Sequence, residues 1–215
     1  MVDNVAITAG TGTTVAADDV GGVLHQRIKL SLGADGSAAD ANSSSGQLLV
    51  SGSISVVSAN FTRPADTAVY AIGDLVANST TAASVVALSY ATAARFSGGA
   101  AMIRRARLNK SGTGITSAIF RLHLYGSDPA ASSGITNGDN GVWLTKVAGY
   151  LGHMDITVDK AFSDAAKAIG APSIGAEITF IPSSGSTIYG LVEARAAYTP
   201  ANAEVFTVEL EIYQG

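Results

Sequence analysis

The stretch that decides the fold is residues 115–126, ITSAIFRLHLYG. From Phe120 onward, apolar side chains fall at every second position and alternate with polar or amphipathic ones: Phe120, Leu122 and Leu124 against Arg121, His123 and Tyr125. Successive side chains of a β-strand point to opposite faces of the sheet, so this alternation predicts a strand with one buried face and one wet face. Strands of that kind are typical of antiparallel sheets.

The same alternation recurs along most of the chain, in segments such as 47–63 and 205–214, with turn residues between the segments. About eight to ten strands of this kind predict an all-β fold, a jelly-roll-like antiparallel β-sandwich with at most one or two short helices. The helix candidate is residues 159–170, DKAFSDAAKAIG. Asp159 could cap it, and four apolar side chains follow at helical spacing: Phe162, Ala165, Ala166 and Ile169.

The N-terminal residues 1–46 are expected to form an extended arm, and residues 47–215 the sandwich body. In 22–33, GVLHQRIKLSLG, one face of the expected strand is apolar and the other is basic. The Gly/Ser-rich residues 33–47 resemble a flexible connector. We expect the arm to assemble with a neighbouring molecule by adding its strand to an exposed sheet edge, although it could instead belong to the sheet of its own domain. The candidate assembly residues are Leu24, Arg27, Ile28, Lys29, Leu30 and Leu32.

A second candidate surface is basic. No Asp or Glu occurs between Leu75 and Ser127, and this window contains the segment RRARLNK. Strict alternation would place Arg104 on one side of a strand and Arg105 and Arg107 on the other. The segment could pair with acidic groups of another subunit or simply be solvated. The candidate basic interaction face is Arg104, Arg105, Arg107 and Lys110.

Composition narrows the possible functions. Charged residues make up 14% of the 215 residues, below the roughly 25% usual for soluble domains. Such a surface suits a protein that buries much of its area against copies of itself or a scaffold, or a rigid extracellular β-protein. The net charge of −4 argues against general nucleic-acid binding. The chain has no Cys and no run of apolar residues long enough to span a membrane, and we expect no secretion signal in its first residues.

Reactive groups are sparse. His25, His123 and His153 show no pairing at metal-ligand spacing, and the His153-x-Asp155 pair is a weak signal alone. The glycine-rich loops with Asp35, Asp40, Asn137, Asp139 and Asn140 could hold calcium, but the same residues favour turns. Glu209 and Glu211 share a strand face, and Trp143 is the one tryptophan that could stack on a sugar. We therefore expect no catalytic residues, no metal and no cofactor.

Four segments resemble a broad group of tailed-bacteriophage virion structural proteins: 9–36 (AGTGTTVAADDVGGVLHQRIKLSLGADG), 61–77 (FTRPADTAVYAIGDLVA), 120–129 (FRLHLYGSDP) followed by YLG at 150–152, and 190–212 (GLVEARAAYTPANAEVFTVELEI). The resemblance implies a jelly-roll-like body in a multimeric surface component, such as a head decoration (cement) protein. The expected function is then non-enzymatic: a homotrimer that binds the major capsid protein on the virion surface, after assembly in the bacterial cytoplasm. A tail or fibre-associated protein that binds a receptor or glycan is the alternative.

Overall fold

A computed structural model describes residues 17–26, 52–130, 135–143 and 147–215, and the chain divides into two units, 1–50 and 51–215. In the first unit, β1 (Ala17–Val20) and β2 (Val23–Gln26) form an antiparallel hairpin. Gly21 and Gly22 connect them with φ values of +65° and +85°, which is the backbone that a two-residue hairpin turn requires. Of the predicted assembly residues, Leu24 lies in β2, and five lie outside the described residues: Arg27, Ile28, Lys29, Leu30 and Leu32. The predicted connector 33–47 and the boundary at 46 also lie outside them and stay predictions.

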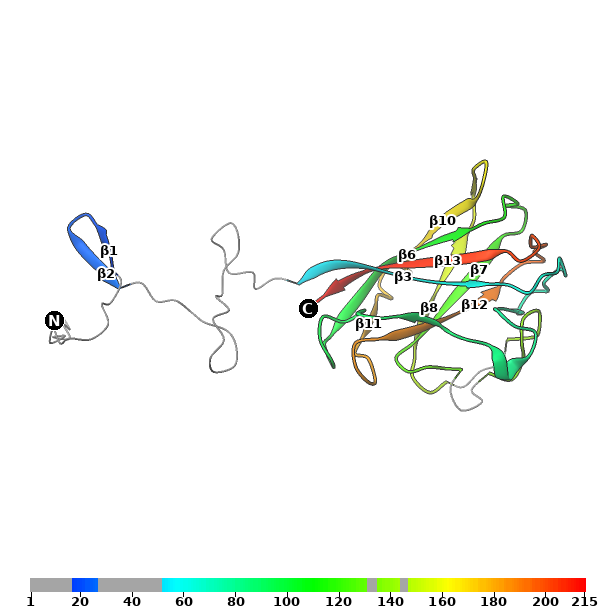
Figure 1. Ribbon diagram of the computed structural model, residues 1–215, viewed down its shortest axis with the longest axis horizontal. Helices are drawn as coiled ribbons and strands as arrows, with labels where there is room; N and C mark the ends of the chain where they lie inside the picture. Colours follow the sequence, from blue (N-terminus) through cyan, green and yellow to red (C-terminus); the bar gives the residue numbers. More distant parts are fainter. Residues whose placement is uncertain (1–16, 27–51, 131–134, 144–146) are drawn as a thin grey trace. The chain divides into compact units, whose positions relative to one another are not determined.

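The second unit is a β-sandwich of two antiparallel sheets, as the sequence predicted (Figure 1). The first sheet has the order β3 (Ser53–Thr62), β13 (Val205–Gln214), β6 (Ala101–Lys110), β10 (Ala166–Gly170) and β9 (Lys160–Ala161), and β11 (Ile178–Phe180) also pairs with β6. The second has the order β4 (Leu75–Val76), β12 (Ile188–Ala194), β7 (Ile119–Tyr125) and β8 (Tyr150–Thr157), and β5 (Leu88–Tyr90) also pairs with β12.

The core lies between the two sheets, where alternate side chains of each strand meet. Phe120, Leu122 and Leu124 of β7 are buried as their spacing predicted. The Phe120 ring packs edge-to-face against Phe206 of β13, with ring centroids 5.3 Å apart, and against Tyr198 at 5.1 Å. Edge-to-face ring pairs contribute stabilising energy in addition to the energy gained by burying the rings. Aromatic contacts between the sheets therefore help to fix how they pack.

The predicted helix over 159–170 is wrong, because these residues form the β9–β10 hairpin. Ala166, Ala168 and Gly170 are buried at every second position, whereas Lys167 and Ile169 between them are exposed. β10 pairs with β6 along its whole length, and the buried side of this pairing takes every second residue. The energy of this pairing and burial outweighs the helical propensity of an alanine-rich segment. The helix found in the described part of the chain is a single 3-10 turn, Ala82–Ser84. None of the described helices is long and apolar enough to cross a membrane.

Candidate functional site

The outer face of the first sheet carries an arginine cluster, which we define as Arg104, Arg105 and Arg107 around Glu209 and Glu211. The Glu211 carboxylate lies 3.2 Å from Arg104, 2.7 Å from Arg105 and 2.9 Å from Arg107, and Arg107 also lies 3.4 Å from Glu209. Glu211 is 7% exposed in its side chain, whereas the arginines are half-exposed. Hydrogen bonding from Arg105, strengthened by the other two arginines, lowers the pKa of Glu211. All three arginines therefore form ion pairs with the same carboxylate, that of Glu211.

The predicted placement of Arg104 on the opposite side from Arg105 and Arg107 is wrong. The register between β13 and β6 shifts, so that Glu211 pairs with Arg105 and the next residue, Ile212, pairs with Ile103. Arg104 is the additional residue of this β-bulge. A bulge breaks the period of two, and it brings all three arginines within reach of Glu211.

Lys110 does not belong to this face, which corrects the predicted basic surface. Its side chain is fully buried, where its Nζ lies 3.0 Å from Glu204 Oε1 and donates to the Gly112 carbonyl at 2.8 Å. The Tyr198 hydroxyl donates to the same carboxylate, and burial is the main cause that raises the pKa of Tyr198. A Cβ at Gly112 would lie 2.1 Å from Glu204 Oε1. Lys110 therefore stabilises the interior of the sandwich through its ion pair with Glu204.

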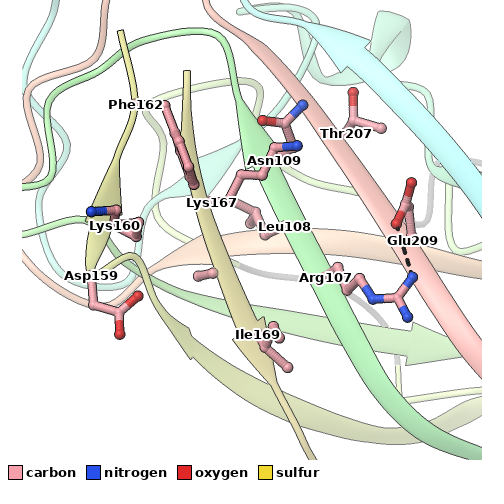
Figure 2. A pocket seen from close by; sticks show the side chains of 11 residues that line it. Arg107, Leu108, Asn109, Asp159, Lys160, Phe162, Lys167, Ile169, Thr207 and Glu209 are labelled. Carbon is pink, nitrogen blue, oxygen red and sulfur yellow. Dashed lines mark hydrogen bonds and ion pairs between the residues drawn. The ribbon is translucent and has the colours of Figure 1, made fainter. Parts of the chain in front are cut away.

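Two hollows flank the arginine cluster at opposite ends of β6 and β13. The first, of about 430 Å³, lies between the β9–β10 hairpin and these strands, and Lys160, Phe162, Lys167 and Ile169 contribute to its lining (Figure 2). The second has a volume of about 610 Å³, and its lining includes Met102, Leu151, Phe180, Ile181 and Tyr213. Exposed apolar side chains lie on the same sheet, notably Ile54, Val56, Ile169 and Tyr213. Arginine and aromatic side chains are both enriched in protein interfaces.

The outer face of the second sheet holds a hydrogen-bonded chain of Glu193, His123, Tyr150 and His153. His123 Nε2 lies 2.8 Å from Glu193 Oε2, and its Nδ1 lies 3.1 Å from the Tyr150 hydroxyl. That hydroxyl lies 3.1 Å from His153 Nδ1. The Trp143 ring stacks on His123 with centroids 4.3 Å apart. Sequence separations of 27 and 70 residues bring these groups together, so no local motif could have indicated the cluster.

Protonation in this chain follows from the contacts. Burial is the main cause that lowers the pKa of His123, although Glu193 opposes the shift, so the neutral imidazole is favoured. Its proton then lies on Nε2, which donates to the carboxylate, and Nδ1 accepts from Tyr150. Burial also raises the pKa of the Tyr150 hydroxyl. The Tyr150 hydroxyl is therefore held in its neutral form, and the carboxylate, the imidazole and the hydroxyl form one hydrogen-bonded chain.

Ion pairs border this chain on the same sheet. Arg121 donates to both oxygens of Asp155, at 2.6 and 2.8 Å, and hydrogen bonding from Arg121 lowers the pKa of Asp155. Arg195 donates to Glu193 at 2.8 Å. The His153-x-Asp155 pair that the sequence singled out is therefore divided between two contacts: His153 with Tyr150, and Asp155 with Arg121.

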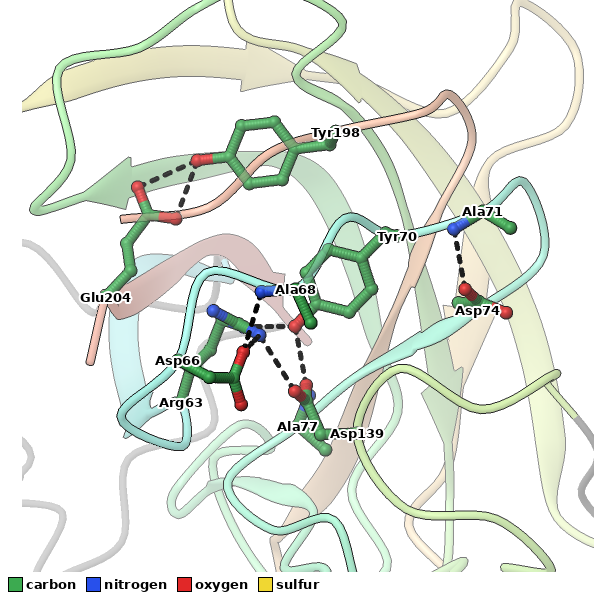
Figure 3. Close-up of polar contacts among 10 residues, drawn as sticks. All are labelled: Arg63, Asp66, Ala68, Tyr70, Ala71, Asp74, Ala77, Asp139, Tyr198 and Glu204. Atoms are coloured by element: carbon green, nitrogen blue, oxygen red, sulfur yellow. Dashed lines mark hydrogen bonds and ion pairs between the residues drawn. The ribbon is translucent and has the colours of Figure 1, made fainter. Parts of the chain in front are cut away.

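The loop with Asn137, Asp139 and Asn140 holds a structural ion pair (Figure 3). Asp139 Oδ1 accepts from the Ala77 amide at 2.7 Å and the Tyr70 hydroxyl at 2.6 Å, and Oδ2 accepts from Arg63 at 2.9 Å. Burial raises the pKa of Asp139, and these three donors oppose the rise. Both oxygens are thus engaged with the protein. In the described ranges, no group of three or more His, Asp or Glu side chains could hold a metal ion. The other predicted calcium residues, Asp35 and Asp40, lie outside those ranges.

No family model matches the chain, and no curated protein matches its sequence. Two candidate surfaces lie on the described residues. One is the arginine cluster between two hollows on the first sheet, and the other is a His–Tyr–Trp cluster on the second sheet, which we define as His123, Tyr150, His153 and Trp143.

Proposed function

We propose that this chain is a non-enzymatic structural protein of a tailed-bacteriophage virion. In this role it is a capsid decoration (cement) protein that binds the major capsid protein on the head surface as a homotrimer and stabilises the shell. It is assembled in the bacterial cytoplasm and takes no cofactor, membrane or nucleic acid as a partner. The resemblance of four segments to phage virion proteins is the basis in sequence, and the strand order is the basis in structure.

The strand order is the observation that carries the proposal. If β4 and β5 count as one interrupted strand, and β9 to β11 as another, the body has eight strand positions. The first sheet then contains positions one, eight, three and six, and the second contains two, seven, four and five. This alternation between sheets supports a jelly roll, the architecture of two Greek keys that occurs in viral capsid and lectin domains.

The outer face of the first sheet supports a role in assembly. Val56 and Tyr213 are both exposed. They lie beside the arginine cluster, because Val56 of β3 pairs with Glu211 of β13, and Tyr213 follows Glu211 on the same face of β13 and pairs with Ile54. Exposed apolar side chains beside a charged cluster suit contact with a shell or another copy. Many such contacts on a symmetric particle add up even when each one is weak.

The test is removal of the protein from the particle and its return. Heads that lack the protein should release DNA at a lower temperature than complete heads, and added protein should restore the difference. The double variant Val56→Asp with Tyr213→Asp should fail to restore it. The matched variant Val86→Asp with Val147→Asp, which changes two exposed apolar residues outside the strands, should restore it. Equal DNA release from heads with and without the protein would contradict a cementing role.

A tail or fibre-associated protein that binds a receptor or glycan is the second candidate. The observation in its favour is the His–Tyr–Trp cluster on the second sheet, where Trp143 and Tyr150 are partly exposed. Aromatic side chains of this kind can stack on sugars, and lectins also use jelly rolls. Gold labelling of the protein on intact virions separates the two candidates, because this second role predicts label on the tail rather than the head.

A further inference from the structure

We propose that the first hollow, between the β9–β10 hairpin and strands β6 and β13, is a docking site for an acidic peptide segment of a protein partner. Binding at this hollow is independent of the proposed function, because it depends only on the side chains that line the hollow. Its volume of about 430 Å³ lies in the range of ligand sites, which is roughly 300–1,000 Å³.

Two lysines of the lining are cross-strand partners. Lys160 of β9 and Lys167 of β10 are direct partners in the register of the hairpin. Like charges at directly opposite positions destabilise a strand pair. Neither lysine forms an ion pair in the part of the chain that the structure describes. An acidic side chain in the hollow would relieve this repulsion and gain two charge contacts.

Apolar groups lie beside the lysines. Phe162 is 47% exposed, and the Lys160 Nζ lies 5.8 Å from its ring centre. Ile169, two residues after Lys167, is 63% exposed. A segment that alternates acidic and apolar side chains would contact both kinds of group at once, whereas a simple inorganic anion would leave Phe162 and Ile169 exposed.

Acceptors and a free edge favour a polypeptide over a polyanion. Asp159 and Glu209 also line the hollow, where their carboxylates could accept hydrogen bonds from the backbone N–H groups of a peptide, and a chain of phosphates or sulfates has no such donors. The Asn109 Oδ1 atom in the lining is buried and has no hydrogen-bond partner among the described residues. Among the described strands, β9 is the last of its sheet, so one side of it can bind an extended backbone.

The surrounding charge supports the same partner. The arginine cluster adjoins the hollow through Arg107, which pairs with Glu209 and Glu211. A basic face on a chain whose net charge is −4 orients the molecule toward acidic surfaces as it approaches them.

The experiment uses the full chain and a fluorescein-labelled peptide of repeated Gly-Glu-Leu-Asp units, with binding followed by fluorescence anisotropy. The wild-type protein should bind this peptide, and the double variant Lys160→Ala with Lys167→Ala should bind it about tenfold more weakly. A matched double variant, Arg95→Ala with Arg121→Ala, removes two cations outside the hollow and should bind as the wild type does. The single variant Phe162→Ser should also weaken binding.

Several results would overturn the proposal. They are a wild-type protein that does not bind the peptide, equal loss of binding in the two double variants, and equal binding of a peptide with Gln and Asn in place of the acids. Displacement of the peptide by inorganic phosphate or by heparin at equal charge concentration would assign the hollow to anions in general. Thermal melting of each variant checks the fold, and loss of the opposed lysines should not lower the melting temperature.

Discussion

The buried ion pair between Arg63 and Asp139 gives the sharpest prediction about stability. Both side chains are 0% exposed. The substitution Asp139→Asn keeps the shape of the side chain and can keep Oδ1 as the acceptor for Ala77 and Tyr70. It replaces Oδ2 with an N–H donor that faces the Arg63 guanidinium, so the arginine loses its buried counter-ion and keeps only the partly exposed Asp66, at 3.3 Å. The Arg63 guanidinium stays charged in the variant, because arginine does not lose its proton in proteins.

Loss of one partner from a buried pair costs about 3–5 kcal/mol. For a domain of this size each kcal/mol corresponds to roughly 2–4 °C in melting temperature, so Asp139→Asn should lower the melting temperature by about 6–20 °C. Calorimetry and urea unfolding at pH 8 measure the change. The control is Asp155→Asn, which breaks the more exposed pair with Arg121 and should cost at most about 1 kcal/mol. Equal losses in the two variants would refute the assignment of Arg63–Asp139 as a stabilising buried pair.

Three further outcomes are expected. The free energy of unfolding should fall between pH 7.5 and pH 5.5, and it should fall less in His123→Gln. The pKa of His123 is lower in the folded protein than in the unfolded chain, so the unfolded chain binds a proton at a higher pH and is favoured as the pH falls. Urea unfolding midpoints at both pH values check this. Gly138→Ala should lower the free energy of unfolding by about 3 kcal/mol or more, because its Cβ would lie 2.1 Å from the Thr80 carbonyl oxygen. The control is Gly114→Ala, which has open space around the new Cβ and should unfold at a urea midpoint near that of the wild type. Phe120→Ala should cost about 3–5 kcal/mol in the same assay, and a loss under 1 kcal/mol would show that its ring is not central to the core.

Period-two patterns in the sequence were enough to predict the β-sandwich and its core strands. Phe120, Leu122 and Leu124 could be assigned to the core because each strand position has one of two faces. The sequence could not reveal the β9–β10 hairpin, because an alanine-rich segment fits either period until a partner strand is known. Tertiary pairing decided between the two.

The candidate sites were harder to predict, since they depend on contacts between distant strands. The bulge at Arg104 has no local signature, yet it places three arginines around Glu211. Lys110 has the same charge as its neighbours but is buried, because Glu204, 94 residues away, supplies its counter-ion. His123 looked isolated for the same reason: its partner Glu193 lies on another strand.

The central claim is that this protein works through contact with a shell and with its own copies. A cryo-electron microscopy reconstruction of the parent virion tests that claim most directly. The account predicts density for three copies of the β-sandwich at junctions of the head surface, with the outer face of the β3–β13–β6–β10 sheet against neighbouring protein. Heads without this density, or sandwich density confined to the tail, would contradict it.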